Sequence, residues 1–553
     1  MKRRFLKSGV ILLAFTMMVA CNDKKKTGKT TPGLGGDGAG GGEVQPGLGS
    51  GSAKPKIKLT KEEKKSYEKA VATYLEAAKT AEKEGEWKGG TCREPAQAFA
   101  AVASGNPRLF TYGKHNEAIT WLHCGEKDKA IAAFNAALGK NSNFSPSLVS
   151  MGYLKAERGD MEGAYRNFER AFVADMRNAE ASYNLGVYYR EKQKSGAQLT
   201  PAEKERFRNL KTPQGHYAYR QWITQKIIGQ KKKLDYKELA LRHLRTVLAI
   251  TSGSEEPNAR LLNLNAYTMI ALVYTDGADK MRSQLALANL VVQEAEKLIG
   301  EYSERVEKEK LPPLCQGKNP TPMDKAVAEL RNVQGLMALK KKEKDLVSGM
   351  KSFTEAVSCD PDFWEAHMNI GAIALSFRGY DRAKASFEVV LKEKKDHPDA
   401  VMGLGVAFRG LSALAMADAK DEALNKAKEK YEKVMSLAKP QDKIYADALY
   451  NLGLLYQDYM SGTSDEDNRA RLKKAQSYYE KYANHPKTVK EAKKDAISRA
   501  KDITRTFKIM EQMDELQKKQ EERERRLKEQ QKNQKEEEKN KESAPNKAAP
   551  RPR

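Results

Sequence analysis

A self-similar pattern with a period of 34 residues runs through the middle of the chain. Gly152 and Gly186 are 34 residues apart in similar frames, SMGYLK and NLGVYY, and Gly371 and Gly405 repeat the interval. A unit of this length accommodates two helices, and one such pair is too small to bury its own apolar stripe. We therefore expect similar helix pairs to stack on one another along the chain.

A second pattern follows the glycine position: a small residue, an aromatic residue four positions later, and a small or apolar residue three positions further on. Its instances are Ala130-Phe134-Ala137, Ala164-Phe168-Ala171, Gly349-Phe353-Ala356, Ala383-Phe387-Val390, Ala427-Tyr431-Val434 and Ala475-Tyr479-Tyr482. Small residues let two helices approach closely, and the aromatic ring fills the gap between neighbouring pairs. No alternating run of β-branched residues indicates a strand, so the predicted fold class is all-α.

These two patterns resemble the tetratricopeptide repeat, whose 34-residue period and L-G-x2-Y…A-x3-F…P sequence are distinctive. The stretches YNLGVYY, at 183–189, and YNLGLLY, at 450–456, match it closely. The resemblance implies an α-solenoid of about eight units. It also implies that the first helix of each unit lines a concave groove that binds other proteins.

Changes in composition divide the sequence into seven segments. They are a leader with the composition of a signal peptide at 1–20, a Gly/Pro/Ser-rich tether at 21–59, an N-terminal helical cap at 60–110, a first repeat subarray at 111–300, a linker at 301–327, a second subarray at 328–486, and a charged tail at 487–553. The first subarray contains an insertion at 195–235, which is basic and carries Tyr217, Tyr219 and Trp222.

The N-terminus has the three zones of a secretory signal peptide. Lys2, Arg3, Arg4 and Lys7 form a basic start, and the apolar run at 9–19 is too short to span a bilayer. The stretch MVAC, at 18–21, resembles the lipobox of bacterial lipoproteins, although Met18 replaces the usual leucine. The resemblance implies that Cys21 is acylated and becomes the mature N-terminus. An ordinary signal peptide with an incidental cysteine is the alternative.

The net charge is +25 and falls to +21 if the four basic residues of the leader are removed. In a cytosolic protein such an excess would indicate nucleic acid. An exported lipoprotein rarely meets nucleic acid, so we expect none as a partner. The charge instead favours anionic lipid, envelope polymers or acidic protein surfaces.

Four cysteines remain besides Cys21, and their spacing matches no zinc site. Disulfides persist outside the cytoplasm, so Cys92–Cys124 and Cys315–Cys359 are possible pairs. Free buried thiols are the alternative.

The sequence contains no catalytic or cofactor-binding motif in a suitable context. GLGGDG, at 33–38, has the G-x-G-x-x-G spacing but lies in the tether, without a strand before it or a helix after it. His115 and His123 could share a helix face, but such residues are more often packing residues than metal ligands. We predict no enzyme activity, no cofactor, no metal and no small-molecule substrate.

Binding is the function that remains, and aromatic and arginine side chains are favoured at interfaces. The groove candidates lie on the first helices of the repeats: Tyr153, Tyr183, Asn184, Arg190, Asn369, Tyr450 and Asn451. The three asparagines occupy one repeat position, where some family members clamp a peptide, but asparagine is also the commonest residue there. The insertion offers a second contact through Tyr217, Tyr219 and Trp222.

The tail begins with Phe507, Met510, Met513 and Leu516, which could form a last apolar stripe. Beyond it Leu527 is the one large apolar residue, and sustained apolar heptads are missing. This part of the chain is expected to be a solvated helix or disordered.

The whole layout is similar to that of the tetratricopeptide lipoprotein of the adventurous gliding-motility machinery of myxobacterial type. The resemblance implies an outer-membrane scaffold facing the periplasm, within a trans-envelope complex. The alternatives are an assembly lipoprotein that docks a secretin or barrel, an accessory subunit of a peptidoglycan-acting enzyme, and a cytosolic adaptor with unmodified Cys21.

Overall fold

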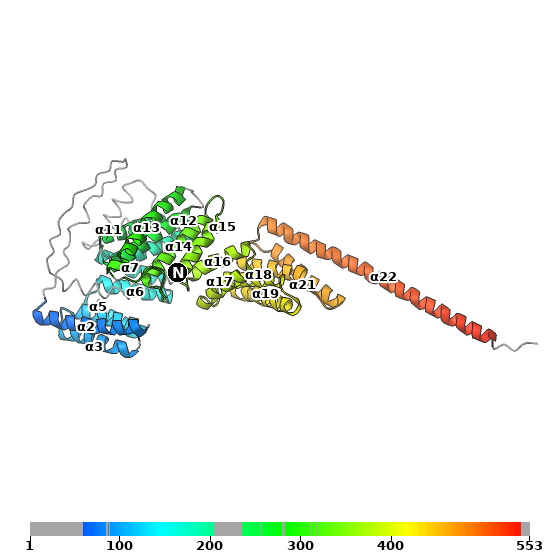
Figure 1. Ribbon diagram of the computed structural model, residues 1–553, viewed down its shortest axis with the longest axis horizontal. Coiled ribbons are helices and arrows are strands. Elements are labelled where there is room, and N and C mark those ends of the chain that lie inside the picture. The colour runs from blue at the N-terminus through cyan, green and yellow to red at the C-terminus, as the bar shows by residue number, and fades with distance from the viewer. Residues whose placement is uncertain are drawn as a thin grey trace, which may run out of the picture. The chain divides into compact units, whose positions relative to one another are not determined.

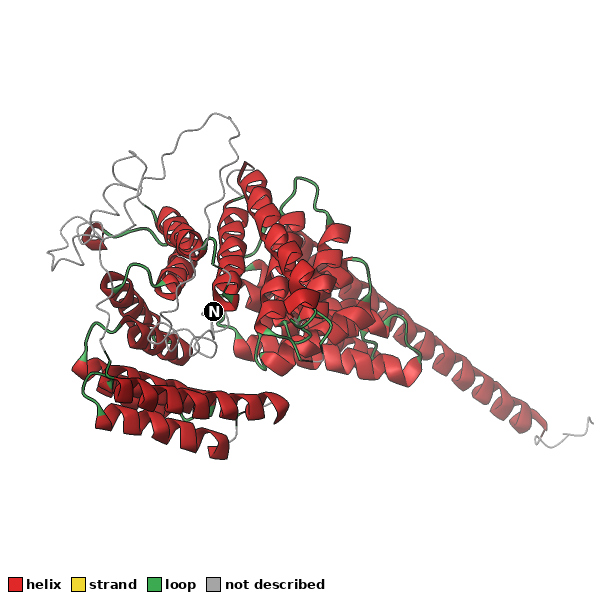
Figure 2. Cartoon of the chain, turned by 60° about the vertical axis from the view of Figure 1, so that its left-hand side comes forward, coloured by secondary structure: helices red, strands yellow, loops and turns green. Residues whose placement is uncertain are grey.

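The computed structural model describes residues 59–84, 87, 89–203, 235–254, 256–278, 283–309, 311–317 and 319–542. In these ranges the regular secondary structure consists of twenty helices, and no strand is present (Figure 2). The chain divides into two compact units, Met1–Asp345 and Leu346–Arg553. The prediction of an all-α fold is confirmed.

The first unit contains eleven of the described helices (Figure 1). They are α2 (Lys61–Glu84), α3 (Gly89–Gly105), α4 (Phe110–His123), α5 (Lys127–Lys140), α6 (Ser145–Arg158), α7 (Met161–Ala174), α8 (Ala179–Lys194), α11 (Tyr236–Thr251), α12 (Pro257–Gly277), α13 (Ser283–Glu309) and α14 (Pro322–Leu339). Consecutive helices pack as pairs, such as α4 with α5, α6 with α7 and α8 with α11.

The second unit continues the same arrangement of paired helices. Its elements are α15 (Leu346–Cys359), α16 (Trp364–Ser376), α17 (Tyr380–Glu393), α18 (Pro398–Ser412), α19 (Ala417–Leu437), α20 (Lys443–Leu454), the π-helical turn η3 (Leu455–Tyr459), α21 (Asp465–Ala483) and α22 (Lys490–Glu542). The pairs are α16 with α17, α18 with α19 and α20 with α21, and α22 packs on α21.

The aromatic residue of the predicted pattern forms the core of each pair. Phe134, Phe168, Phe353, Phe387, Tyr431 and Tyr479 are all at most 1% exposed. The small residues of the pattern, including Ala130, Ala164, Ala383, Ala427 and Ala475, are buried beside them. The repeat pattern in the sequence therefore corresponds to a repeated core, and the fold is an α-solenoid of the tetratricopeptide type.

The glycine of each pair allows the two helices to approach closely. A Cβ atom added to Gly371 would lie 2.7 Å from Cε1 of Phe387, and one added to Gly152 would lie 2.6 Å from Cε1 of Phe168. Protein Cβ atoms essentially never come this close to other heavy atoms, so even alanine would force the helices apart. Glycine is thus required by packing at these crossings.

Local sequence signals set the turn inside the second repeat. Gly159 has φ 90°, a left-handed conformation that ends α6. Asp160 then accepts a hydrogen bond from the backbone N–H of Gly163 and so caps the first turn of α7. The tight turn brings the two helices back onto each other.

The insertion lies between two helices that pack together as one repeat. Helix α8 ends at Lys194 and α11 begins at Tyr236. The Tyr236 hydroxyl donates a hydrogen bond of 2.7 Å to Oε1 of Glu203. This contact holds together the two described ends that flank residues 204–234.

The boundary between the units lies later in the chain than the predicted linker at 301–327. Helix α13 continues to Glu309, and α14 begins at Pro322 behind a capping box formed by Thr321 and Asp324. Helix α14 packs on α12 and α13 through an apolar face that includes Val327 and Leu330. It therefore belongs to the first unit, although the sequence places it in the second subarray.

Candidate protein-binding surface

Three groove candidates of the first unit are buried inside it. Tyr183 and Arg190 are 2% and 1% exposed, and Asn184 is 3% exposed. The expectation that these side chains line an open groove is wrong, because neighbouring helices cover them. Tyr153 is only half-buried, and this burial, together with nearby Glu157, raises the pKa of its hydroxyl to about 12.

Arg190 connects two first helices of adjacent repeats. Its guanidinium lies 2.5 Å from Oδ2 of Asp276, near the end of α12, and 3.2 Å from Oε1 of Glu191. A buried arginine requires such partners because an isolated charge is very unfavourable in a low dielectric. The residue therefore stabilises the array and is unavailable to a partner protein.

The three asparagines share one local contact. The side-chain amides of Asn184, Asn369 and Asn451 donate to the carbonyl oxygens of Glu180, Glu365 and Asp447, four residues earlier, at 2.9, 3.0 and 2.8 Å. A hydrogen bond of this kind satisfies the side chain within its own helix. It accounts for asparagine at this repeat position without a bound peptide.

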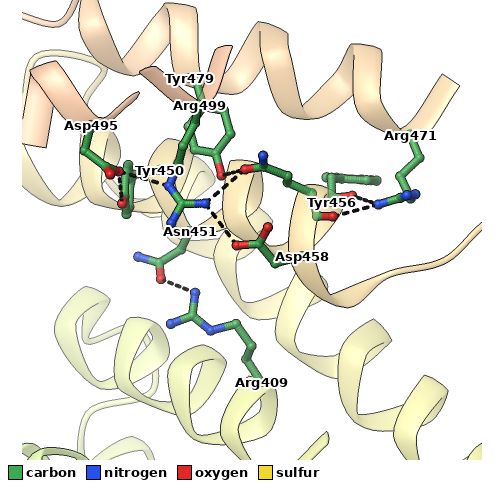
Figure 3. Close-up of polar contacts among 10 residues, drawn as sticks. Arg409, Tyr450, Asn451, Tyr456, Asp458, Arg471, Tyr479, Asp495 and Arg499 are labelled. Carbon is green, nitrogen blue, oxygen red and sulfur yellow. Dashed lines mark hydrogen bonds and ion pairs between the residues drawn. The ribbon is translucent and has the colours of Figure 1, made fainter. Parts of the chain in front are cut away.

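In the second unit, Tyr450 and Asn451 contact other helices of the array (Figure 3). The Tyr450 hydroxyl donates to Oδ2 of Asp495 on α22 at 2.5 Å. Asn451 accepts at Oδ1 a hydrogen bond of 2.9 Å from Nη1 of Arg409 on α18. Burial and the bond to Asp495 raise the pKa of the Tyr450 hydroxyl. Both candidates thus join α20 to its neighbours.

The π-helical turn η3 positions the side chains of Gln457 and Asp458. Nη1 of Arg471 donates to the carbonyl oxygens of Tyr456 and Gln457 at 2.6 and 2.9 Å, which satisfies acceptors at the end of the helix. Tyr479 donates to Oε1 of Gln457 at 2.8 Å. Such π-helical turns often occur at functional sites. Here η3 directs Asp458 toward α22.

Arg499 of α22 lies at the centre of this region. Its guanidinium donates to Asp495 at 3.0 Å, to Asp458 at 3.1 Å and to Oε1 of Gln457 at 3.1 Å. The side chains of Asp458 and Asp495 are 40% and 46% exposed, so both carboxylates also face solvent. We call Arg409, Asn451, Asp458, Asp495 and Arg499 the unit 2 polar surface.

The unit 2 polar surface presents charged groups of both signs to solvent. It combines two exposed carboxylates with two partly exposed guanidinium groups on elements that are hydrogen-bonded to one another. Fixed charges of both signs give specificity for a partner of complementary pattern.

The sequence did not identify Arg409, Asp458, Asp495 or Arg499 as candidates. Arg409 could have been found from the repeat pattern, because it follows Gly405 by four positions, as Arg190 follows Gly186.

Cys92 and Cys124 are joined by a disulfide, one of the two pairings that the spacing leaves open. Their Cα atoms are 6.2 Å apart, and the bond connects α3 to the residue that follows α4.

The pairing of Cys315 with Cys359 stays a prediction. Cys21, Tyr217, Tyr219 and Trp222 lie outside the described residues, so their roles also stay predictions.

We expect the Cys92→Ala/Cys124→Ala double variant to lose about 2–4 kcal/mol of unfolding free energy, because the bond closes a long loop of the unfolded chain. The sequence separation that it spans is 32 residues. Denaturant unfolding, with hydrogen exchange of α2 to α4, would measure the loss. Equal protection of these helices in the variant and the parent chain would contradict the expectation.

His115 and His123 are packing residues that make separate contacts. His115 is buried and its Nδ1 lies 3.0 Å from Oγ of Ser147, whereas Nδ1 of His123 lies 3.0 Å from the Tyr74 hydroxyl. Within the described ranges, no three His, Cys, Asp or Glu side chains gather in a way that could hold a metal ion.

His243 should make the first unit sensitive to acid. It is fully buried against the rings of Phe172 and Tyr189, and burial lowers its pKa to about 3. The unfolded imidazole binds a proton near pH 6.5, so its contribution to stability is complete above that pH and declines as the pH falls toward 3.

As the pH falls from 6.5 to 4.5, the pH slope of unfolding free energy in the His243→Phe variant should become smaller than that of the parent chain, by a difference that approaches about 1.4 kcal/mol per pH unit. Phenylalanine can keep the ring contacts and does not titrate. Denaturant unfolding of both chains at several pH values would measure the difference. Equal slopes in the two chains would exclude His243 as a source of acid sensitivity.

Among the helices that the structure describes, none combines the length and the apolar character needed to cross a bilayer. This finding concerns the described residues and leaves the leader at 1–20 aside.

The repeated helix pairs and their glycine–aromatic crossings define a helical-repeat protein of the tetratricopeptide type. No family model matches the sequence, and no curated protein is similar to it in sequence. A tetratricopeptide repeat protein from Parabacteroides merdae is similar in structure, with 12% identity, a TM-score of 0.27, and coverage of 70% of this chain and 98% of that one.

Two further solved structures are similar at comparable levels. Yeast Tom70 has 13% identity and a TM-score of 0.26, with 80% of this chain and 97% of that chain covered. Human IFIT1, solved as a dimer with PPP-AAAA, has 14% identity and a TM-score of 0.30, with coverage of 77% and 91%. TM-scores this low carry no argument about partners, and the expectation of no nucleic-acid partner stays a prediction.

Proposed function

We propose that the protein is a lipid-anchored scaffold that binds other proteins of the cell envelope. The observation that carries this proposal is the repeated packing of helix pairs within each of the two units, because stacked repeats of this kind present extended surfaces to partners. The unit 2 polar surface is the part of these surfaces best suited to a charged protein segment. It is formed by Arg409, Asn451, Asp458, Asp495 and Arg499.

Two features favour an exported location. The basic and apolar leader ends in MVAC, so acylation of Cys21 would anchor the chain to a membrane. The Cys92–Cys124 disulfide belongs to the oxidising environment outside the cytoplasm. The proposed anchor is the outer membrane, with the repeats facing the periplasm.

The gliding-motility assignment rests on the similar layout of lipobox, tether, repeats and charged tail. In this proposal the protein joins components of a trans-envelope complex and performs no chemistry of its own. The buried Arg190–Asp276 contact supports such a role within the first unit, because a scaffold that transmits force needs helices that do not separate under load.

The anchor is tested with the Cys21→Ala variant, expressed in the native cell and followed by membrane fractionation and acyl labelling. We expect the parent chain to incorporate label and stay with the outer membrane. The variant should remain an uncut, unlabelled precursor. The Cys92→Ala variant serves as a control that keeps Cys21. Acyl labelling that is absent from the parent chain would overturn the lipoprotein proposal.

The scaffold role is tested by chemical crosslinking in cells, followed by mass spectrometry of the captured chains. We expect crosslinks to envelope proteins of a motility complex. Asp458→Lys should reduce these crosslinks, whereas Glu480→Lys, an exposed charge change on α21, should not. Crosslinks confined to secretion or peptidoglycan proteins would overturn the motility assignment. No reduction in Asp458→Lys would remove the unit 2 polar surface from the proposal.

A further inference from the structure

Helix α22 has two parts with different surroundings. Near its start, Ala496, Ala500 and Ile503 are buried against the preceding helices, and Phe507 packs partly against the same core. From Glu511 to Glu537 every residue is exposed, while the helix continues without a break (Figure 1). This exposed part is about 40 Å long, from its 1.5 Å rise per residue.

The exposed part carries a stripe with the spacing of a coiled coil. Alternating steps of four and three residues lead through Ile509, Met513, Leu516, Gln520, Arg523, Leu527, Gln530 and Gln534. Between Glu511 and Glu537, one of the seven stripe positions is charged, whereas sixteen of the other twenty are. A stripe that excludes charge in so charged a helix indicates a face for contact with another helix.

The stripe is open to a partner. Ile509, Met513 and Leu516 are 56%, 62% and 61% exposed, and Leu527 is 49% exposed. At 100° per residue, the stripe lies on the side of α22 roughly opposite Ala496, Ala500 and Ile503. The repeat array of the same chain therefore does not cover it.

We propose that a second copy of this chain covers the stripe, and that two α22 helices pair as a parallel coiled coil. A lipid surface is a poor occupant, because the exposed part carries eight basic and nine acidic side chains and no basic face. In a parallel pair each stripe residue meets its own copy. Ile509, Met513, Leu516 and Leu527 would then form four apolar layers, and the glutamines would form polar layers that fix the register. Arg523 would also meet its own copy, and its long side chain would have to carry the guanidinium out to solvent to relieve this like-charge contact.

The flanking charges select the parallel orientation. With Met513 and Leu527 at heptad position a, Lys519 occupies position g and Glu524 the following position e. A parallel pair therefore places Lys519 of each helix beside Glu524 of the other. An antiparallel pair in the register that sets Ile509 against Leu527 would instead bring the two Lys519 side chains together. Like charges across an interface are unfavourable.

Sedimentation equilibrium of the full chain, in density-matched detergent and with Cys21→Ala to prevent acylation, tests the pairing. We expect a mass of twice the 61.9 kDa chain at micromolar concentration. Leu516→Lys should raise the dissociation constant at least tenfold with unchanged helical content, because Leu516 is exposed in the single chain. Arg525→Glu, a charge change on the outer face, is the matched control. A monomer at all concentrations would overturn the proposal.

The orientation is tested by crosslinking and by charge exchange. A single Leu516→Cys substitution should give crosslinked dimers with a short bis-maleimide, whereas Arg525→Cys should not. Lys519→Glu should weaken the pair, and Lys519→Glu with Glu524→Lys should restore it. Crosslinking between Leu516→Cys in one chain and Gln520→Cys in the other, without crosslinks of Leu516→Cys alone, would show an antiparallel pair and overturn the parallel one. The outcome is independent of membrane anchoring.

Discussion

Replacing Arg190 with alanine should lower the unfolding free energy of the first unit by about 3–5 kcal/mol. The arginine side chain is 1% exposed and its guanidinium is 2.5 Å from Oδ2 of Asp276. The substitution leaves the Asp276 carboxylate without its buried counter-ion and opens a cavity between α8 and α12. Denaturant unfolding and hydrogen exchange of these two helices would measure the loss.

The matched control is Arg158→Ala, which removes a surface ion pair. Arg158 lies 3.4 Å from Asp128, and the two side chains are 59% and 99% exposed. Solvent screening leaves such pairs with about 0–1 kcal/mol. The Arg190→Met/Asp276→Leu double variant should recover much of the loss, because apolar side chains can replace a buried ion pair. Similar losses in Arg190→Ala and Arg158→Ala would contradict the role of Arg190.

Replacing Phe387 with alanine should destabilise the second unit by about 3–5 kcal/mol, the usual range for a buried phenylalanine. The Phe387 ring is 1% exposed and fills the space at the crossings of Gly371 and Gly403. Neither glycine has a side chain that could move into the cavity. Because a repeat array unfolds in parts, hydrogen exchange of α16 to α18 is the appropriate local measurement.

Phe377→Ala provides the control, since it makes the same substitution ten residues earlier in the chain. Phe377 is 58% exposed, so its loss should change stability by less than about 0.5 kcal/mol. A loss in Phe387→Ala no larger than that in Phe377→Ala would show that the aromatic position does not hold the repeats together.

The repeated core was predictable because its pattern is local. Phe387 follows Ala383 by four positions in the sequence, and this spacing places both on one helix face. The repeat pattern also stops near residue 194 and resumes near residue 236 in the sequence, which is why an insertion is predicted between these positions. Both predictions depend on neighbouring residues alone.

The roles of the groove candidates depend on contacts that no local pattern reveals. Arg190 meets Asp276, and Tyr450 meets Asp495 on a helix that the sequence describes only as a charged tail. Whether a polar side chain on a first helix faces solvent or a neighbour is decided by the next repeat. The sequence therefore assigned Tyr183, Asn184 and Arg190 to an open groove, whereas the neighbouring helices bury them.

The hydrogen bond between Tyr236 and Glu203 has a consequence for how this protein can change over time. The Tyr236 hydroxyl and Oε1 of Glu203 are 2.7 Å apart. The chain between these two residues therefore leaves the repeat array and returns to it at nearly the same place. The closure entropy of such an excursion depends only weakly on its length. Residues 204–234 could therefore be shortened, lengthened or exchanged for another sequence while the helix pairs on either side keep their packing.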